Sequence, residues 1–206
     1  MQINEQYGKI ADQATIEKTA KALQKNGITA FVVETGEDAK TKVLELIPEN
    51  SEVMTMTSMT LQAINLAKEI NESKRFNSVR NKLNAMDMKT QWPEMRRLGA
   101  SPEWVIGSVH AVTEDGHLLI ASQSGSQLPA YAYAAGQVIW VVGAQKIVKN
   151  VEEGIKRIYE YSYPLEDERA LKVYGAHSAV NKILLVNKEI SPGRITVILV
   201  KDKLGF

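Results

Sequence analysis

The sequence predicts an α/β protein with an open, mostly parallel sheet flanked by helices. In the N-terminal third, segments with apolar residues at helical spacing alternate with short, continuously apolar segments. The latter are rich in β-branched residues and lack polar alternation, as is typical of strands that are buried on both faces. A chain of 206 residues suffices for one covered core, so residues 1–206 are expected to form a single domain.

The N-terminal part contains three expected helices with two strands between them. The helices cover residues 16–26, 37–47 and 60–70, and the strands cover residues 28–33 and 52–56. Gly27 ends the first helix because glycine favours the backbone conformation that follows a helix. Pro48 ends the second because proline restricts the residue before it. This alternation predicts a parallel sheet with helices on both faces.

The rest of the chain is less regular. Residues 71–99 are polar and rich in Asn, Lys, Arg and Met, and short helices are expected there at 79–86 and 93–98. Further strands are expected at 104–106, 109–113, 118–121, 138–142, 183–186 and 195–200, and further helices at 127–135 and 151–161. An SPGR turn separates the last two strands.

The composition excludes several functions. The chain has no cysteine, so its own side chains cannot hold disulfides, thiolate zinc sites or iron–sulfur clusters. The 25 basic and 24 acidic residues nearly balance, so no overall field attracts nucleic acid. The apolar segments are too short to span a membrane, and the N-terminus lacks a secretory signal pattern. We expect a cytoplasmic protein that binds neither nucleic acid nor membrane.

Two loops with hydroxyl side chains follow predicted strands. Thr57, Ser58 and Thr60 stand where the strand at 52–56 passes into a helix, and Ser122, Gly125 and Ser126 follow the strand at 118–121. Ligands of open α/β sheets bind beyond the carboxyl ends of strands, and helix N-termini favour anions. The alternatives are a capped helix in the first loop and a tight turn in the second.

Known motifs for nucleotides, metals and serine hydrolysis are missing. The second loop lacks the GK[ST] ending of a phosphate loop, and the chain has no GxGxxG fingerprint, so no nucleotide cofactor is expected. Its three histidines lack zinc-ligand spacing, so no metal site is expected. A GxSxG elbow is also absent.

Charged and amide residues complete the candidate site. Glu114 and Gly116 lie in a Glu-Asp-Gly turn between apolar segments, a strong hairpin signal. If Glu114 instead faces the hydroxyl loops, it is a candidate general base or nucleophile. Arg80, Asn181 and Lys182 lie beside apolar positions. They are candidates for binding an anion if they converge, or are solvated residues with packed stems.

Two segments carry a family resemblance. The first is GSVHAVTEDGHLLIASQSGSQLPAYAYAAGQVIWVVGAQKIVKNVEEGIKRI, and the second is SAVNKILLVNKEISPGRITVILVKDKLGF. Both resemble the LUD domain family, which is associated with lactate utilisation, and the resemblance extends from about Thr55 onward. Glu114 and Gly116 match a family motif close to A-E-T-G-T, whereas Asp115 and His117 replace its small hydroxyl residues.

The resemblance implies a fold like that of the NagB/RpiA/CoA-transferase group, with a smaller β-rich part. Relatives with that fold bind sugar phosphates, CoA esters or folates at strand ends, and in CoA transferases a glutamate is the nucleophile. Lactate-utilisation members work with partner proteins that carry iron–sulfur centres, so this chain would be one component of such a system. Carried over by fold analogy, the glutamate role would fall to Glu114.

Three functional hypotheses follow. The leading one is a crevice, formed by the three loops, that accepts a small carboxylate, a phosphate or a CoA ester, with a link to lactate or related acid metabolism. The second is a non-catalytic binding or assembly subunit, a homodimer through its aromatic and Met-rich surface. The third is an isomerase or acyl transferase that uses Glu114.

Overall fold

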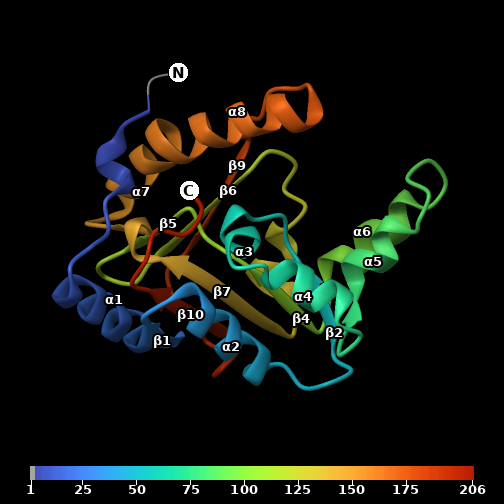
Figure 1. Ribbon diagram of the computed structural model, residues 1–206, viewed down its shortest axis with the longest axis horizontal. Helices are drawn as coiled ribbons and strands as arrows, with labels where there is room; N and C mark the ends of the chain where they lie inside the picture. The colour runs from blue at the N-terminus through green and yellow to red at the C-terminus, as the bar shows by residue number, and fades with distance from the viewer. Residues whose placement is uncertain (1–2) are drawn as a thin grey trace.

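A six-stranded parallel sheet lies at the centre of the computed structural model, which describes residues 3–206 (Figure 1). Its strand order is β1-β10-β7-β4-β2-β3, and all neighbouring strands pair in parallel. The strands are β1 (Thr29–Val33), β2 (Glu52–Thr55), β3 (Asn77–Ser78), β4 (Trp104–Gly107), β7 (Gln137–Gly143) and β10 (Ile195–Val200). The predicted α/β fold class is confirmed.

A smaller mixed sheet has the order β8-β5-β6-β9. Its strands are β5 (Ala111–Thr113), β6 (Leu118–Ser122), β8 (Ile147–Val148) and β9 (Lys182–Val186). β6 pairs antiparallel with both β5 and β9, while β8 pairs parallel with β5. The last two predicted strands are therefore present but belong to different sheets, so the chain through the SPGR turn connects the two sheets.

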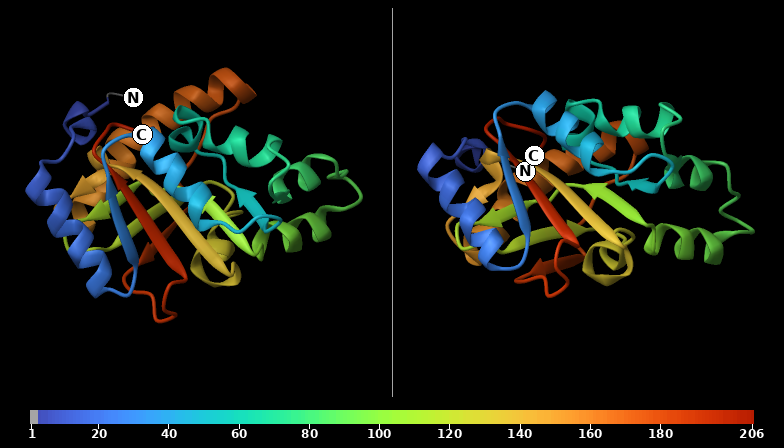
Figure 2. Two further views of the ribbon diagram at one scale, coloured as in Figure 1. Left: turned by 60° about the horizontal axis from the view of Figure 1, so that its bottom comes forward. Right: turned by 90° about the horizontal axis from the view of Figure 1, so that it is seen from below.

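Helices surround both sheets, as the further views in Figure 2 show. The α-helices are α1 (Gln13–Lys25), α2 (Gly36–Leu46), α3 (Met59–Ala63), α4 (Leu66–Glu72), α5 (Val79–Asn84), α6 (Trp92–Ala100), α7 (Val151–Arg157) and α8 (Tyr163–Tyr174). The other helical segments are short. They are the 3-10 turns η1 (Glu5–Gly8) and η3 (Ala144–Lys146) and the π-helical turns η2 (Ala130–Ala134) and η4 (Ile158–Ser162). Within residues 3–206, no helix is both long and apolar enough to cross a membrane.

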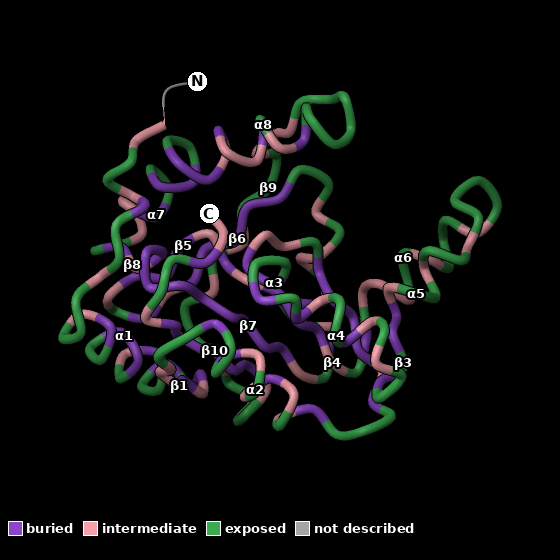
Figure 3. The backbone as a smooth tube through the Cα atoms, viewed as in Figure 1, coloured by how far each residue is buried: buried purple, intermediate pink, exposed green. Residues whose placement is uncertain are grey.

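The large sheet has a packed core on each face. Alternate residues of β7 divide between the two: Trp140 packs with α1 and the smaller sheet, whereas Ile139 and Val141 pack with α2, α3 and α4. This division follows from the two-residue period of a strand. In Figure 3 the strands of the large sheet are mostly buried and the helices are buried on one side. Two-sided burial explains why these strands read as continuous apolar segments.

Three helical predictions need correction. The helix expected at 60–70 is two helices, because Asn65 adopts a left-handed conformation with φ of 54°. The helix expected at 127–135 is present at 128–134, but most of it is the π-helical turn η2, whose carbonyls at Ala130 and Tyr131 accept hydrogen bonds from Arg194. Helix α8 was not predicted, although Pro164 near its start and Gly175 after its end are ordinary helix boundary signals.

Candidate functional site

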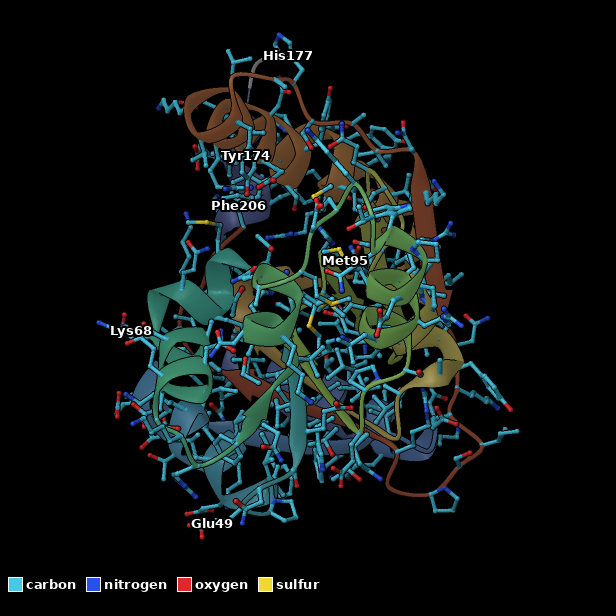
Figure 4. The ribbon with its side chains drawn as sticks, turned by 90° about the vertical axis from the view of Figure 1, so that its right-hand side faces the viewer. Glu49, Lys68, Met95, Tyr174, His177 and Phe206 are labelled. Atoms are coloured by element: carbon cyan, nitrogen blue, oxygen red, sulfur yellow. The ribbon has the colours of Figure 1, made fainter. Side chains whose placement is uncertain are left out.

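A cleft of about 1350 Å³ lies at the carboxyl ends of strands of the large sheet. One wall is the segment 79–100, named here the arm, which contains α5 and α6. The opposite wall includes Arg169 and Tyr174 of α8, together with Phe206. Figure 4 faces this side of the molecule and labels Met95 of the arm, Tyr174 and Phe206. The location agrees with the strand-end rule for open α/β sheets.

The cleft brings together six of the residues that the sequence singles out. They are Thr57, Ser58, Thr60, Arg80, Gly125 and Ser126. Ser122 lies behind the second loop, where its hydroxyl accepts a hydrogen bond from the Gly125 N–H at 2.8 Å and donates to Gln127 Oε1 at 2.9 Å. The interpretation of that loop as a tight turn is therefore confirmed, although the turn also borders the cleft.

The first hydroxyl loop has both a local and a site-facing part. Ser58 Oγ accepts a hydrogen bond from the Leu61 N–H at 3.4 Å, so Ser58 caps α3 as the alternative interpretation expected. Thr60 is buried, and its hydroxyl donates to the Leu204 carbonyl at 3.1 Å. Thr57 is exposed at the cleft surface. All three residues border the cleft, but the hydroxyls of Ser58 and Thr60 already form hydrogen bonds with the backbone of the chain.

Glu114 does not face this cleft, which corrects the expectation that it joins the hydroxyl loops. β5 and β6 form an antiparallel hairpin, so the turn after β5 lies at the opposite end from the loop after β6. Glu114 Oε2 instead accepts a 2.6 Å hydrogen bond from Lys18 of α1, and its backbone N–H donates to Val148. The hairpin interpretation of the Glu-Asp-Gly turn is confirmed.

Gly116 serves this turn. Its φ is +85°, and an added Cβ would stand 2.7 Å from the carbonyl carbon of Ala22 in α1. We expect Gly116→Ala to lower the free energy of unfolding by roughly 2–4 kcal/mol, because the backbone strain is joined by overlap with main-chain atoms. Urea unfolding provides the measurement.

Gly193 provides a matched control for this substitution. It also has a positive φ, +76°, but an added Cβ there would meet no atom within 4 Å. Gly193→Ala should therefore cost only the backbone strain, about 1 kcal/mol. Equal losses in the two variants would contradict the close contact between the turn and α1.

Asn181 and Lys182 border the second loop from outside the cleft. Asn181 Nδ2 donates to the Gln123 carbonyl at 3.1 Å. The stem of Lys182 passes so close to Gly125 that an added Cβ there would lie 2.7 Å from Lys182 Cδ. Both residues are exposed and neither lines the cleft, so the structure assigns them to the packing of this loop.

Lys146, which the sequence reasoning passed over, is the most informative side chain of the cleft. It follows β7 in η3, lines the cleft and is only 2% exposed. Its Nζ donates hydrogen bonds to Thr60 Oγ1 at 2.9 Å, to Ser108 Oγ at 3.1 Å and to the Val109 carbonyl at 3.1 Å. The lysine, which follows β7, thus contacts residues that follow β2 and β4 of the same large sheet.

The hydrogen bonds around Lys146 match its charged form. The Ser108 hydroxyl donates to the Val141 carbonyl at 2.6 Å, and the Thr60 hydroxyl donates to Leu204, so both oxygens are free to accept from Nζ. An ammonium has three donors and finds three acceptors here. None of them carries a negative charge, and burial, with the nearby Arg157 charge second, lowers the pKa of Lys146 well below its ordinary value. The site therefore holds a buried amine without a counter-charge.

His110 contributes a neutral imidazole next to Lys146. Burial, followed by the charges of Lys146 and Arg157, lowers the pKa of His110 to about 3. Its Nδ1 accepts a hydrogen bond from the Ala121 N–H at 3.1 Å, so the ring proton is on Nε2. His110 lines the cleft, and its Nε2–H group makes no hydrogen bond to any of residues 3–206.

Arg80 adds a second cation on the arm side. Its Nε and Nη2 donate to the Thr55 carbonyl at 3.1 and 2.6 Å, and burial lowers the pKa of its guanidinium. The Nη1 group makes no hydrogen bond to any of residues 3–206. The carbonyl of Thr55 therefore holds the guanidinium in place while one edge stays free for a ligand.

The cleft as a whole is basic. Its lining contains one acidic side chain, Glu166, and five basic ones: Arg80, Arg96, Arg97, Lys146 and Arg169. Only Arg169 is paired, with Glu166 at 2.6 Å; within the described part of the chain no carboxylate lies within 4.0 Å of the other four. Although the whole chain has a net charge of only +1, unpaired positive charge is concentrated in this cleft.

One sequence signal could have identified Lys146. It stands three residues beyond a seven-residue apolar strand, at the carboxyl end where the strand-end rule places ligands. The local sequence does not show that the lysine is buried, because its covering groups come from distant elements. Metal binding has no comparable support, since residues 3–206 contain no group of three His, Cys, Asp or Glu side chains that could hold an ion.

Comparisons with known proteins agree with the sequence resemblance. The model of the LUD domain matches residues 16–200. The fold is similar to the crystal structure of a DUF162 family protein from Deinococcus radiodurans, with a TM-score of 0.57 and 12% identity over 93% of this chain and 99% of that chain. No protein with curated annotation matches the chain. Because the family model covers most of the sequence, the chain belongs to the LUD domain family.

Proposed function

We propose that the cleft binds an organic anion of the carboxylate, phosphate or CoA ester class, with the anionic group near Lys146. The observation that carries this proposal is the burial of Lys146 among neutral acceptors. A buried cation without a partner is costly, and a bound anion would supply the missing charge. Binding would therefore raise the pKa of Lys146 and stabilise its three hydrogen bonds.

The surrounding groups fit an oxyanion. The Nε2–H of His110 and the free edge of Arg80 are donors that stay available at neutral pH. The Ser108 and Thr60 hydroxyls can turn their protons from backbone carbonyls toward a ligand. The one acidic side chain of the lining, Glu166, is paired with Arg169, so the remaining donors favour a carboxylate or phosphate over a cation.

The link to lactate metabolism is part of this proposal and rests on the family. A 2-hydroxy acid such as lactate has a carboxylate for Lys146 or Arg80 and a hydroxyl that the imidazole of His110 can meet. Within that proposal the chain acts together with partner proteins that carry redox centres, because it has no cysteine to hold such a centre itself.

Isothermal titration calorimetry with the purified chain tests the proposal. The probes are L-lactate, pyruvate, acetate, inorganic phosphate and coenzyme A, each titrated at one low ionic strength. We expect at least one of them to bind, and Lys146→Met to weaken that binding by at least about 10-fold, because the variant keeps the side-chain volume and removes the charge.

Two control variants separate the cleft from other charged surfaces. Lys149→Met removes an exposed lysine only three residues away, and Glu114→Gln removes the carboxylate at the other end of the hairpin. Both should leave the affinity within about 2-fold of the unmodified chain. Absence of binding by all five probes, or equal weakening in Lys146→Met and Lys149→Met, would overturn the proposal.

A further inference from the structure

Methionine is concentrated in the cleft. Every methionine in residues 3–206 lines it: Met54, Met56, Met59, Met86, Met88 and Met95. Met54 and Met56 stand two positions apart at the end of β2 and belong to the buried core. The others come from the start of α3 and from the arm. We name these six residues the methionine wall.

Core packing accounts for Met54 and Met56 but not for the other four residues of the methionine wall, which are exposed or only partly buried. α6 contains no buried residue, and Met88 is 62% exposed. Two aromatic side chains that also line the cleft are open as well: Trp92 on the arm is 48% exposed and Tyr174 on α8 is 64% exposed. Apolar groups that face one another across an open cleft are typical of a ligand site.

The volume of the cleft supports the same interpretation. A cleft of about 1350 Å³ exceeds the roughly 300–1,000 Å³ of most small-molecule pockets. An anion as small as acetate or lactate would occupy only the part near Lys146. The remaining space also borders the methionine wall and the aromatic residues, so a larger ligand would contact apolar as well as charged surface.

We propose that the anion bound in this cleft is amphipathic, a monocarboxylate with an unbranched alkyl chain of several carbons that lies along the methionine wall. The inference rests on the proposed function, since Lys146 and Arg80 are taken to hold its carboxylate. Methionine side chains are flexible and polarisable, so they fit a chain without demanding one shape. The arrangement selects for an anionic head and an apolar tail together.

A chain-length series tests this inference. The probes are sodium acetate, butanoate, hexanoate and octanoate, titrated by calorimetry. Affinity should increase about 3-fold for each added methylene that the cleft buries, and the heat capacity change of binding should become more negative along the series. Hexan-1-ol, which has the same chain without the charge, should bind at least about 10-fold more weakly than hexanoate.

Variants of the wall make the test specific. The double variant Met86→Gln and Met95→Gln keeps side-chain size but adds polarity, and we expect it to lower octanoate affinity by at least about 5-fold with little effect on acetate. Ile190→Gln, at a 93% exposed apolar residue outside the cleft, is the control and should change neither.

The outcomes separate the two proposals. If acetate binds in a Lys146-dependent manner and octanoate binds no more tightly, the inference is overturned and the proposed function stands. Hexan-1-ol binding as tightly as hexanoate would also overturn the inference, because the tail would then bind without the head. If no carboxylate or other anion binds, both proposals fail.

Discussion

Replacing Arg157 with alanine is expected to lower the free energy of unfolding by roughly 3–5 kcal/mol. This side chain of α7 has no exposed surface. Its Nε donates to the carbonyls of Tyr7 and Gln145 at 3.2 and 3.3 Å, while Nη1 donates to the His110 carbonyl and to Ser162 Oγ. Alanine would leave three buried or part-buried carbonyls without this donor, and each such loss costs up to about 1–3 kcal/mol.

The large effect is expected because Arg157 joins four separate elements. Its partners belong to η1, to η3, to η4 and to the residue just before β5. Its guanidinium also lies 5.1 Å from the centre of the Tyr161 ring. Burial lowers the pKa of Arg157 to about 10, so the group stays charged at neutral pH. The hydrogen bonds of Nε and Nη1 therefore offset part of the cost of a buried charge, while Nη2 makes no hydrogen bond to residues 3–206.

Denaturant unfolding provides the measurement, and neighbouring substitutions provide the controls. Arg157→Lys keeps the charge but cannot reach all four partners, so it should lose less stability than alanine. Lys156→Ala changes an exposed neighbour that pairs with Glu152 and Glu153, and should have little effect. If Arg157→Ala loses no more stability than Lys156→Ala, the role of Arg157 in joining these elements is contradicted.

Lys146→Met is expected to raise the free energy of unfolding near neutral pH by about 1–3 kcal/mol in the absence of ligand. The variant replaces a buried amine that has no counter-charge with an apolar side chain of similar size. The Ser108 and Thr60 hydroxyls keep their carbonyl partners, so the substitution leaves few groups unsatisfied. A gain in stability with a loss of ligand binding would mark Lys146 as a functional residue.

The same residue predicts a pH dependence. The pKa of Lys146 is lowered in the folded chain, whereas the pKa of a lysine in an unfolded chain is about 10.4. Between these two values the unfolded chain binds more protons, so the stability of the unmodified chain should rise with pH relative to Lys146→Met. The stability gap between the two should shrink as the pH rises toward about 10.4.

Unfolding at a series of pH values checks this result, with Lys149→Met as the matched control. Lys149 is exposed, and its replacement should leave the pH dependence of the parent chain unchanged. A gap between the unmodified chain and Lys146→Met that stays constant from neutral to alkaline pH would contradict a lowered pKa for Lys146 in the fold.

The candidate site was only partly predictable. The rule that ligands bind at strand ends led to Thr57, Ser58, Thr60, Gly125 and Ser126, and all five border the cleft. The same rule misplaced Glu114, because it applies to the parallel strands of the open sheet. β5 instead belongs to an antiparallel hairpin of the smaller sheet, which reverses the end at which its turn lies. Local sequence does not reveal to which sheet a three-residue strand belongs.

The sequence by itself determined the α/β class and five of the six strands of the large sheet, because burial on two faces makes each strand a continuously apolar segment, and its motifs determined the family; the two-residue β3 was not predicted. Only the tertiary structure decided which polar residues share a cleft. Lys146 is buried by partners from residues 60, 108 and 109, and the methionine wall is assembled from β2, α3 and the arm. Such clusters depend on how distant elements pack together, and the sequence next to each residue does not reveal that packing.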